Sequence, residues 1–197
     1  MKTGLVVLAV VAVVALAAVG WFVSVGNDLV AKDQAVQEAW AQVQNVYQRR
    51  ADLIPNLVET VKGFAAQERT VLEEVTRARA AASSIQITPE VLNDPAALRK
   101  FQEVQSQLGS ALSRLLVTVE RYPDLKSNQN FLALQSQLEG TENRIAVERR
   151  RYNEVVRAYN TAVRRFPGSL VASMRGFRDR AFFEATPGSE TPPAIKF

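Results

Sequence analysis

An uninterrupted apolar run of 21 residues, Leu5–Val25, is the feature that most constrains how this chain can fold. At about 1.5 Å per residue, a helix of this length reaches roughly 32 Å, which is enough to cross the hydrocarbon core of a bilayer. No charge interrupts the run, and its only less hydrophobic members, Gly20 and Ser24, are tolerated in spanning helices. We therefore predict a short N-terminus at 1–4, a transmembrane anchor at 5–25 and a water-exposed remainder.

A cleaved signal peptide is the alternative interpretation of this run. Lys2 gives a positive start, and the stretch 15–17 offers small residues of the kind found at cleavage sites. The hydrophobic run continues past that point to Val25, which favours an uncleaved anchor. Lys2 and the α-amine upstream narrowly outnumber Lys32 downstream, which by the positive-inside rule indicates an inside N-terminus and an outside domain. The count is nearly tied, so the side of the soluble domain stays undecided.

The composition removes several classes of chemistry. The chain has no histidine and no cysteine, which excludes Ser-His-Asp and Cys-His catalysis and zinc sites built on these residues. Its glycines are scattered singly, so no phosphate-binding loop is present in the sequence. The net charge of +4 is too small to indicate nucleic-acid binding. We expect a protein that is not an enzyme and needs no cofactor or metal.

The remainder of the chain has the apolar spacing of amphipathic helices. Hydrophobic residues recur at intervals of three and four, as in Val36, Trp40, Val43 and Tyr47. This pattern predicts an all-α fold: an antiparallel up-and-down four-helix bundle over 28–167. The expected helices are 28–50, 53–82, 95–121 and 127–165, followed by an apolar and basic tail segment at 168–185 and a disordered C-terminus at 186–197.

Local signals mark most of these boundaries. Asp94 precedes a proline and is a favourable N-cap, and Ser127 is positioned to cap the last long helix. Pro55 is harder to place, because a proline inside a helix costs about 3 kcal/mol. If Asp52 is an N-cap, Pro55 falls in a first turn and the chain divides near 50–53; one long kinked helix is the alternative.

The predicted helical seam also contains polar residues. They fall on apolar stripe positions and are Glu68, Gln105, Thr141 and Glu148. A polar layer that fixes the register of the helices is one interpretation. A small ligand or metal pocket between helices is the other.

The C-terminal third is rich in arginine. Ten arginines face three acidic residues between positions 144 and 180. Beyond 168, apolar and basic residues mix in a segment that can fold back on the bundle, lie on an anionic membrane or bind a partner. The candidate contact residues are Arg175, Phe177, Arg178, Arg180, Phe182 and Phe183.

One stretch carries a family resemblance. Residues 48–63, Gln-Arg-Arg-Ala-Asp-Leu-Ile-Pro-Asn-Leu-Val-Glu-Thr-Val-Lys-Gly, strongly resemble the LemA family of bacterial proteins. The later stretches 142–145, 151–154, 159–161 and 165–167 are similar to the same family, and so is the order of an anchor followed by a helical domain. The resemblance implies a four-helix bundle behind a single membrane anchor, and it favours the division at 50–53.

The resemblance implies little about activity, and no catalytic residues carry over. Some relatives are associated with magnetosome membranes, and others with envelope stress and a membrane protease. The family is described with its domain in the cytoplasm, which opposes the near-tied charge count, so topology stays open. A bacterial inner-membrane location follows from the resemblance.

Three functions remain in view. The first is a non-enzymatic scaffold or adaptor that recruits protein partners or self-associates at the membrane. The second is membrane shaping or anionic-lipid binding through the Arg-rich C-terminal region. The third is an enzyme that uses Glu68 and Glu148 as an acid/base pair.

Overall fold

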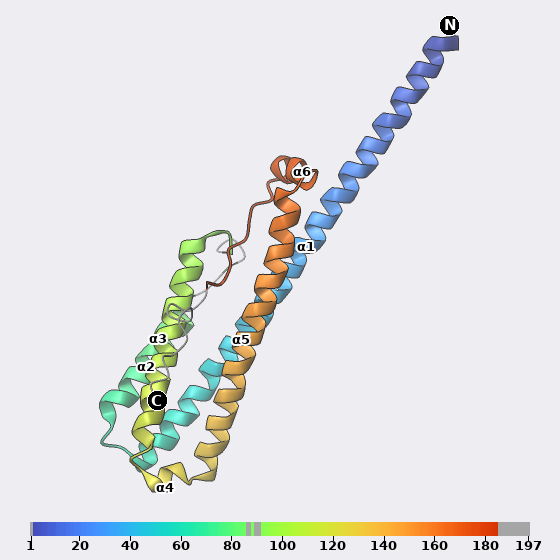
Figure 1. The fold of residues 1–197 in the computed structure, drawn as a ribbon. Coiled ribbons are helices and arrows are strands. Elements are labelled where there is room, and N and C mark those ends of the chain that lie inside the picture. The colour runs from blue at the N-terminus through green and yellow to red at the C-terminus, as the bar shows by residue number, and fades with distance from the viewer. Residues whose placement is uncertain (1, 86–87, 89–91, 185–197) are drawn as a thin grey trace, which may run out of the picture.

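The computed structural model describes residues 2–85, 88 and 92–184, and all the regular structure in these residues is helical (Figure 1). This confirms the all-α fold class. The segment 186–197, for which we predicted disorder, lies outside the described residues. The helices are α1 (Lys2–Phe64), α2 (Arg69–Ser84), α3 (Pro95–Val119), α4 (Pro123–Lys126), α5 (Gln129–Arg164) and α6 (Gly168–Arg175).

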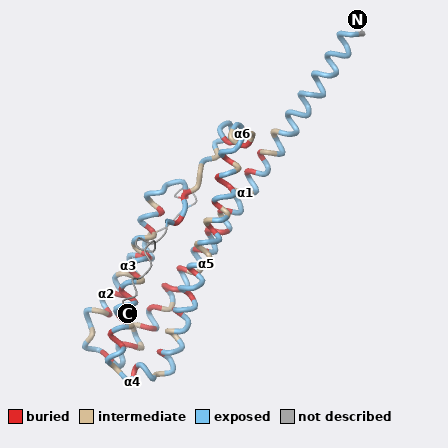
Figure 2. The backbone as a smooth tube through the Cα atoms, viewed as in Figure 1, coloured by how far each residue is buried: buried red, intermediate tan, exposed pale blue. Residues whose placement is uncertain are grey.

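Helix α1 joins the apolar run to the helical domain without a break. Its residues 3–21 are exposed and project away from the other helices, as Figures 1 and 2 show. Within the described residues it is the one helix that is long and apolar enough to cross a membrane. Because the helix is continuous, the direction of the apolar run also fixes the direction of the domain.

The helical domain (residues 26–184) is built from two helical pairs. Helix α1 packs along α5, and α2 packs along α3. The loop 65–68 reverses the chain and brings α2 against α1, so that the two pairs share one edge (Figure 1). Helix α6 packs on both α1 and α5 at the end from which the apolar run leaves.

The predicted division of helices 28–50 and 53–82 is wrong, and so is the single kinked helix over the whole stretch. Helix α1 runs through Pro55 and ends at Phe64. Proline cannot donate a hydrogen bond to the carbonyl four residues earlier, which here belongs to the buried Ala51. The Arg79 Nε atom donates to that carbonyl oxygen at 2.8 Å. A side chain from α2 therefore replaces the backbone donor that the proline lacks.

The other helix starts follow local capping chemistry. Asp94 accepts a hydrogen bond from the Ala96 amide at 2.8 Å, as its position before Pro95 predicts. The cap at α5 is Asn128 and not Ser127, because the Asn128 side chain accepts from the amides of Asn130 and Phe131. The predicted cap of this helix, Ser127, is therefore wrong by one residue.

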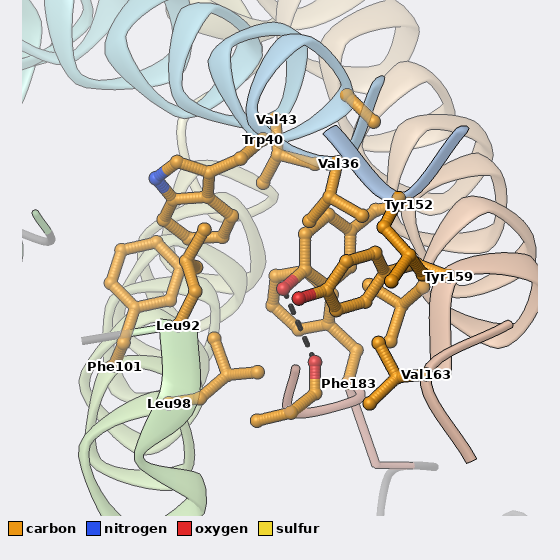
Figure 3. Packing of buried hydrophobic residues seen from close by; sticks show 14 of the residues in the cluster. Val36, Trp40, Val43, Leu92, Leu98, Phe101, Tyr152, Tyr159, Val163 and Phe183 are labelled. Carbon is orange, nitrogen blue, oxygen red and sulfur yellow. Dashed lines mark hydrogen bonds between the residues drawn. The ribbon is translucent and has the colours of Figure 1, made fainter. Parts of the chain in front are cut away.

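Buried apolar side chains form two clusters along the domain. The anchor-side core is rich in aromatic residues and is assembled from α1, α3, α5, α6, Leu92 and the chain after α6. Trp40 lies edge-on to Phe101 and Tyr152, with ring centroids 5.6 Å apart in each pair (Figure 3). The distal core is largely aliphatic and lies between α1, α2, α3, α4 and α5, around Ile54, Leu115 and their neighbours.

Candidate functional site

A polar layer separates the two cores. Its centre is Arg50, which lies on α1 and is only 3% exposed. One terminal nitrogen donates to the Glu142 carboxylate on α5 at 2.8 Å. The other donates to both the side-chain and the main-chain oxygen of Gln105 on α3. One guanidinium therefore bridges three helices and stands between α3 and α5.

The ring of Tyr47 lies against this guanidinium, with the Arg50 Cζ atom 5.1 Å from the ring centroid. Burial raises the pKa of the Tyr47 phenol, while the positive charges of Arg149 and Arg50 act in the opposite direction. The phenol is consequently neutral at physiological pH, and it packs as an aromatic surface under the arginine. Arg50 Nε is buried without a hydrogen-bond partner in the described part of the chain.

Two of the four residues predicted for a polar layer lie at this level. Gln105 contacts Arg50, and Thr141 directly precedes Glu142 on α5, with its hydroxyl donating to the Gln137 carbonyl. Both residues are buried and hydrogen-bonded, as the interpretation of a polar layer expects, and Gln105 also lines the groove described below.

Glu68 and Glu148 do not belong to the layer. Glu68 lies at the start of α2, where it accepts hydrogen bonds from Tyr122 and Arg121. Glu148 is about 28 Å along α5 from the first residue of that helix. The structure therefore does not bring the two carboxylates together as an acid/base pair. Within the described residues, no three acidic side chains are grouped as metal ligands would be.

A large groove opens beside the polar layer. Its volume is about 1430 Å³, and it is lined by α3 and α5 with contributions from α1 and α2. Lining residues run from Arg99 to Leu116 on α3 and from Gln135 to Arg149 on α5, which corresponds to about 26 Å and 21 Å of helix. The groove exists because α3 packs on α2 and α5 packs on α1, with Arg50 between them.

The groove wall carries both signs of charge. Among its described lining residues are five arginines and five glutamates: Arg50, Arg77, Arg99, Arg114, Arg149, Glu74, Glu103, Glu139, Glu142 and Glu184. Some of them pair across neighbouring helices, as Arg114 does with Glu74. Arg99 approaches Glu184 at 3.6 Å. This balance suits a polar surface with mixed charge, and it does not favour a purely anionic or purely apolar ligand.

An extended segment after α6, residues 177–184, covers the anchor-side core, and we call it the C-terminal strap. The side chain of Asn160 donates to the Arg180 carbonyl and accepts from the Arg180 amide, both at 2.9 Å. Asn153 forms the same reciprocal pair with Phe183, again at 2.9 Å. Two side-chain amides on α5 thus hold the strap as a neighbouring strand would.

The spacing of the two asparagines explains how a helix can hold an extended chain. Seven residues of helix from Asn153 to Asn160 rise about 10 Å. Three residues of extended chain from Arg180 to Phe183 also cover about 10 Å. The repeat on the helix therefore matches the repeat on the strap. Gln102 on α3 adds a third reciprocal pair with the Glu184 backbone, at 3.0 and 3.2 Å.

Arg180 fastens the strap to α1. Its guanidinium contacts the Asp33 carboxylate at 2.6 Å, and the two side chains are only 10% and 15% exposed. It also donates to the Asn93 side chain at 2.8 Å. Tyr159 donates to the Arg178 carbonyl at 3.0 Å, and burial followed by the Asp33 charge raises the pKa of its phenol.

The structure divides the predicted contact residues into two groups. Phe183 is buried against Trp40, with ring centroids 5.9 Å apart, and Arg180 is held by Asp33, so neither faces a partner or a lipid. Phe177 is partly buried against the anchor-side core. The exposed residues of the set are Arg175, Arg178 and Phe182.

The sequence analysis missed the residues that organise these sites. The predicted division near 50–53 puts Arg50 at a helix boundary and not in a buried layer. Asn153 and Asn160 enter the sequence analysis only as members of stretches that resemble the family. Their spacing of seven, which puts two amides on one face of a helix, is the signal that could have drawn attention to them.

Comparison with known proteins gives one match. A model of the LemA family matches residues 39–197, which include α2 to α6 and the C-terminal half of α1. A search of curated proteins found no match. The matched region contains Arg50, the groove and the strap, so these features lie within the part of the chain that defines the family. The chain belongs to the LemA family.

Proposed function

We propose that this protein is a membrane-anchored, non-enzymatic scaffold whose groove binds a helical segment of a partner protein. The observation that carries the proposal is the groove of about 1430 Å³ between α3 and α5. Its helical walls are about 21–26 Å long, which corresponds to roughly 14 residues of a bound helix. A helix that lies in a groove between helices is a recurrent mode of protein recognition.

The charge of the groove indicates the kind of partner. Five arginines and five glutamates line the described wall, so the complementary surface also carries both signs. A partner helix with mixed charge fits this wall better than a lipid tail or a nucleic acid. The proposal includes the arrangement of the helices. In it the domain is an up-and-down four-helix bundle in which the seam between α3 and α5 is left open for the partner.

The anchor strengthens such a scaffold. A partner confined to the same membrane meets the groove at a raised effective concentration, so modest affinity is enough for recruitment. We place the anchor in the bacterial inner membrane, and the proposal is the same for a domain on either face. Anionic-lipid binding is the second candidate function, and the exposure of Arg175 and Arg178 near the anchor supports it.

Photo-crosslinking in cells tests the scaffold. A photo-reactive phenylalanine derivative replaces Ser106 or Asn143, which line the groove from α3 and α5. The control positions, Val117 and Val147, lie on the same two helices, are 71% and 52% exposed and do not line the groove.

We expect discrete partner adducts from the two groove positions and none from the two controls. Because the control positions are well exposed, nonspecific contact would label them as well. Adducts at twice the monomer mass would assign the groove to self-association. Equal labelling from all four positions, or none, would contradict the scaffold proposal.

A further inference from the structure

Helix α6 lies at the point where the apolar run leaves the helical domain. The loop before it forms a small surface recess with the end of that run, lined by Ser24, Val25 and Asp28 on one side and by Phe166 and Pro167 on the other. The guanidinium of Arg175 on α6 lies against α1 at Gly26, which places the two helices next to each other here. Figure 1 shows α6 at the end of the domain that faces the anchor.

The outer face of α6 is apolar. Leu170 and Met174 are four residues apart on α6, so they lie on one face of the helix, and they are 50% and 68% exposed. Phe166, which is 76% exposed, lies in the loop just before α6, and we call these three residues the apolar stripe. The opposite face of the helix, with Val171 and Ala172, is buried against the anchor-side core. Single exposed apolar residues are ordinary, but a row of three large ones beside a membrane anchor has a specific partner at hand.

Positive charges flank this apolar stripe. Arg165, Arg175 and Arg178 are exposed, and none of them forms an ion pair within the described residues. Arg164 differs, because it is paired with Asp179 at 2.6 Å. An apolar stripe with unpaired arginines beside it has the chemistry of a helix that lies in the interface of an anionic membrane.

The height of this surface above the membrane follows from the length of the anchor. The apolar run reaches roughly 32 Å, and a hydrocarbon core is about 30 Å thick, so the edge of the core falls close to Val25. Trp21, 43% exposed, lies just inside that edge, where indole rings favour the interface. Since Phe166 lies beside Val25, the stripe sits at the level of the lipid headgroups.

We propose that Phe166 and α6 form a membrane-docking foot, in which Phe166, Leu170 and Met174 enter the interface and Arg165, Arg175 and Arg178 bind anionic lipid headgroups. The foot rests on the membrane anchoring that the proposed function also uses. A second contact beside the anchor limits the tilt of the domain relative to the membrane. It therefore holds the partner groove at a defined height and inclination above the membrane surface.

The absence of cysteine from the chain makes a direct test possible. Single cysteines replace Leu170 or Met174 in the full chain, with Leu16 as the membrane reference and Val117 as the water reference. Each carries an environment-sensitive fluorophore. The protein is reconstituted in vesicles of about three parts phosphatidylcholine to one part phosphatidylglycerol that contain a nitroxide-labelled lipid.

We expect quenching at 170 and 174 to be at least about threefold stronger than at 117 and to approach that at 16. Quenching at 170 and 174 equal to that at 117, with position 16 still quenched, would overturn the foot and leave the anchor intact. If position 16 also escapes quenching, the anchor fails, and with it both the foot and the proposed membrane scaffold.

The headgroup contacts have their own control. Replacing Arg165, Arg175 and Arg178 with glutamine should reduce quenching at position 174 by about twofold in the anionic vesicles. Replacing the exposed residues Arg144, Arg150 and Arg151 with glutamine makes the same charge change on a part of α5 farther from the anchor. This control variant should leave the quenching at position 174 unchanged. An equal response of the two triple variants would overturn the role of the anionic headgroups.

Discussion

The two halves of the domain are stabilised in different ways. The distal core is closed by helix against helix, with aliphatic side chains such as Ile54 and Leu115 fully buried between α1, α2, α3 and α5. The anchor-side core is aromatic and is closed by the C-terminal strap, which side-chain amides hold in place. Arg50 lies at the boundary and bridges α3 and α5.

This difference shows how a helical domain can keep one side open. In the distal half, helices cover the aliphatic core, whereas in the anchor-side half the strap covers the aromatic rings. The groove between α3 and α5 passes both halves, from Arg99 and Arg149 at the anchor-side end to Leu116 and Gln135 at the distal end. The polar layer therefore maintains the spacing of α3 and α5, and its removal should have the largest effect on the stability of the domain.

Substitution of Arg50 should have the largest effect on stability and is the strongest test of the difference between the two halves. Arg50→Met retains the buried stem but deletes the donors to Glu142 and Gln105, and we expect a loss of about 2–3 kcal/mol in the free energy of unfolding. Arg49→Met, at the exposed neighbouring position, is the matched control and should change it by less than about 0.5 kcal/mol. Urea unfolding in detergent, followed by circular dichroism, measures both. Equal effects would show that the layer does not hold the halves together.

Release of the strap should affect the anchor-side half alone. Asn160→Leu removes both hydrogen bonds to Arg180 and leaves the backbone amide and carbonyl of Arg180 unpaired. We expect this to lower the free energy of unfolding by about 2 kcal/mol. Hydrogen exchange should accelerate at the strap and near Trp40, with the amides around Leu115 unchanged. Asn143→Leu, at an exposed position of the same helix, is the control. Acceleration throughout the domain would mean that the two halves unfold as one.

The distal half contains a coupled pair that a double-mutant cycle can isolate. Arg79→Met removes the donor to the Ala51 carbonyl and should cost about 1–2 kcal/mol. In a Pro55→Ala background the backbone amide returns as a donor, so the same substitution should cost clearly less. Thermal unfolding of the four proteins gives the coupling. Additive effects would contradict the replacement of the backbone donor by Arg79.

Alkaline pH should lower the stability of the anchor-side core, and we expect this effect to be smaller than those of the substitutions above. Burial raises the pKa of Tyr152 well above its usual value, and its hydroxyl donates to the Ala181 carbonyl at 3.2 Å. Above about pH 10 the unfolded chain loses this proton while the folded chain keeps it, so stability falls by up to about 1.4 kcal/mol per pH unit. Below that pH no dependence arises from this group.

A comparison of melting temperatures between about pH 9 and pH 11 measures this dependence. Tyr152→Phe should reduce the slope of the curve, and the raised pKa values of Tyr47 and Tyr159 account for part of what remains. Tyr122→Phe, outside the anchor-side core, should leave most of the slope. A curve that Tyr152→Phe does not change would assign the alkaline loss to other groups.

Local chemistry was mostly predictable from the sequence where the partners are close in the chain, although the cap of α5 is Asn128 and not the predicted Ser127. The cap at Asp94 follows from the residue and the proline after it, and the positions of Gln105 and Thr141 between the cores follow from helical spacing. Pro55 was misread for a physical reason. The rule that proline removes a hydrogen bond holds here, but the replacement donor is Arg79, and only the tertiary fold brings it to Ala51.

The position of the C-terminal strap was harder to predict from the sequence than the course of the chain at Pro55. Its alternation of apolar and basic residues is equally compatible with a lipid surface, a partner or a fold-back contact. Only the match between two helical turns at Asn153 and Asn160 and three extended residues at 180–183 decides among these. The groove could not be predicted from helical spacing, because that spacing indicates which face of a helix is buried and not which helix covers it.

The central claim is that α3 and α5 stand apart when no partner is bound. Spin labels at Ser106→Cys and Asn143→Cys, in the purified full chain reconstituted in lipid nanodiscs, measure this separation by pulsed electron paramagnetic resonance. We predict a separation clearly wider than that of packed helices, whose axes lie about 8–10 Å apart. A distance distribution that matches direct packing of α3 on α5 would mean a closed bundle with no groove, and would contradict the scaffold.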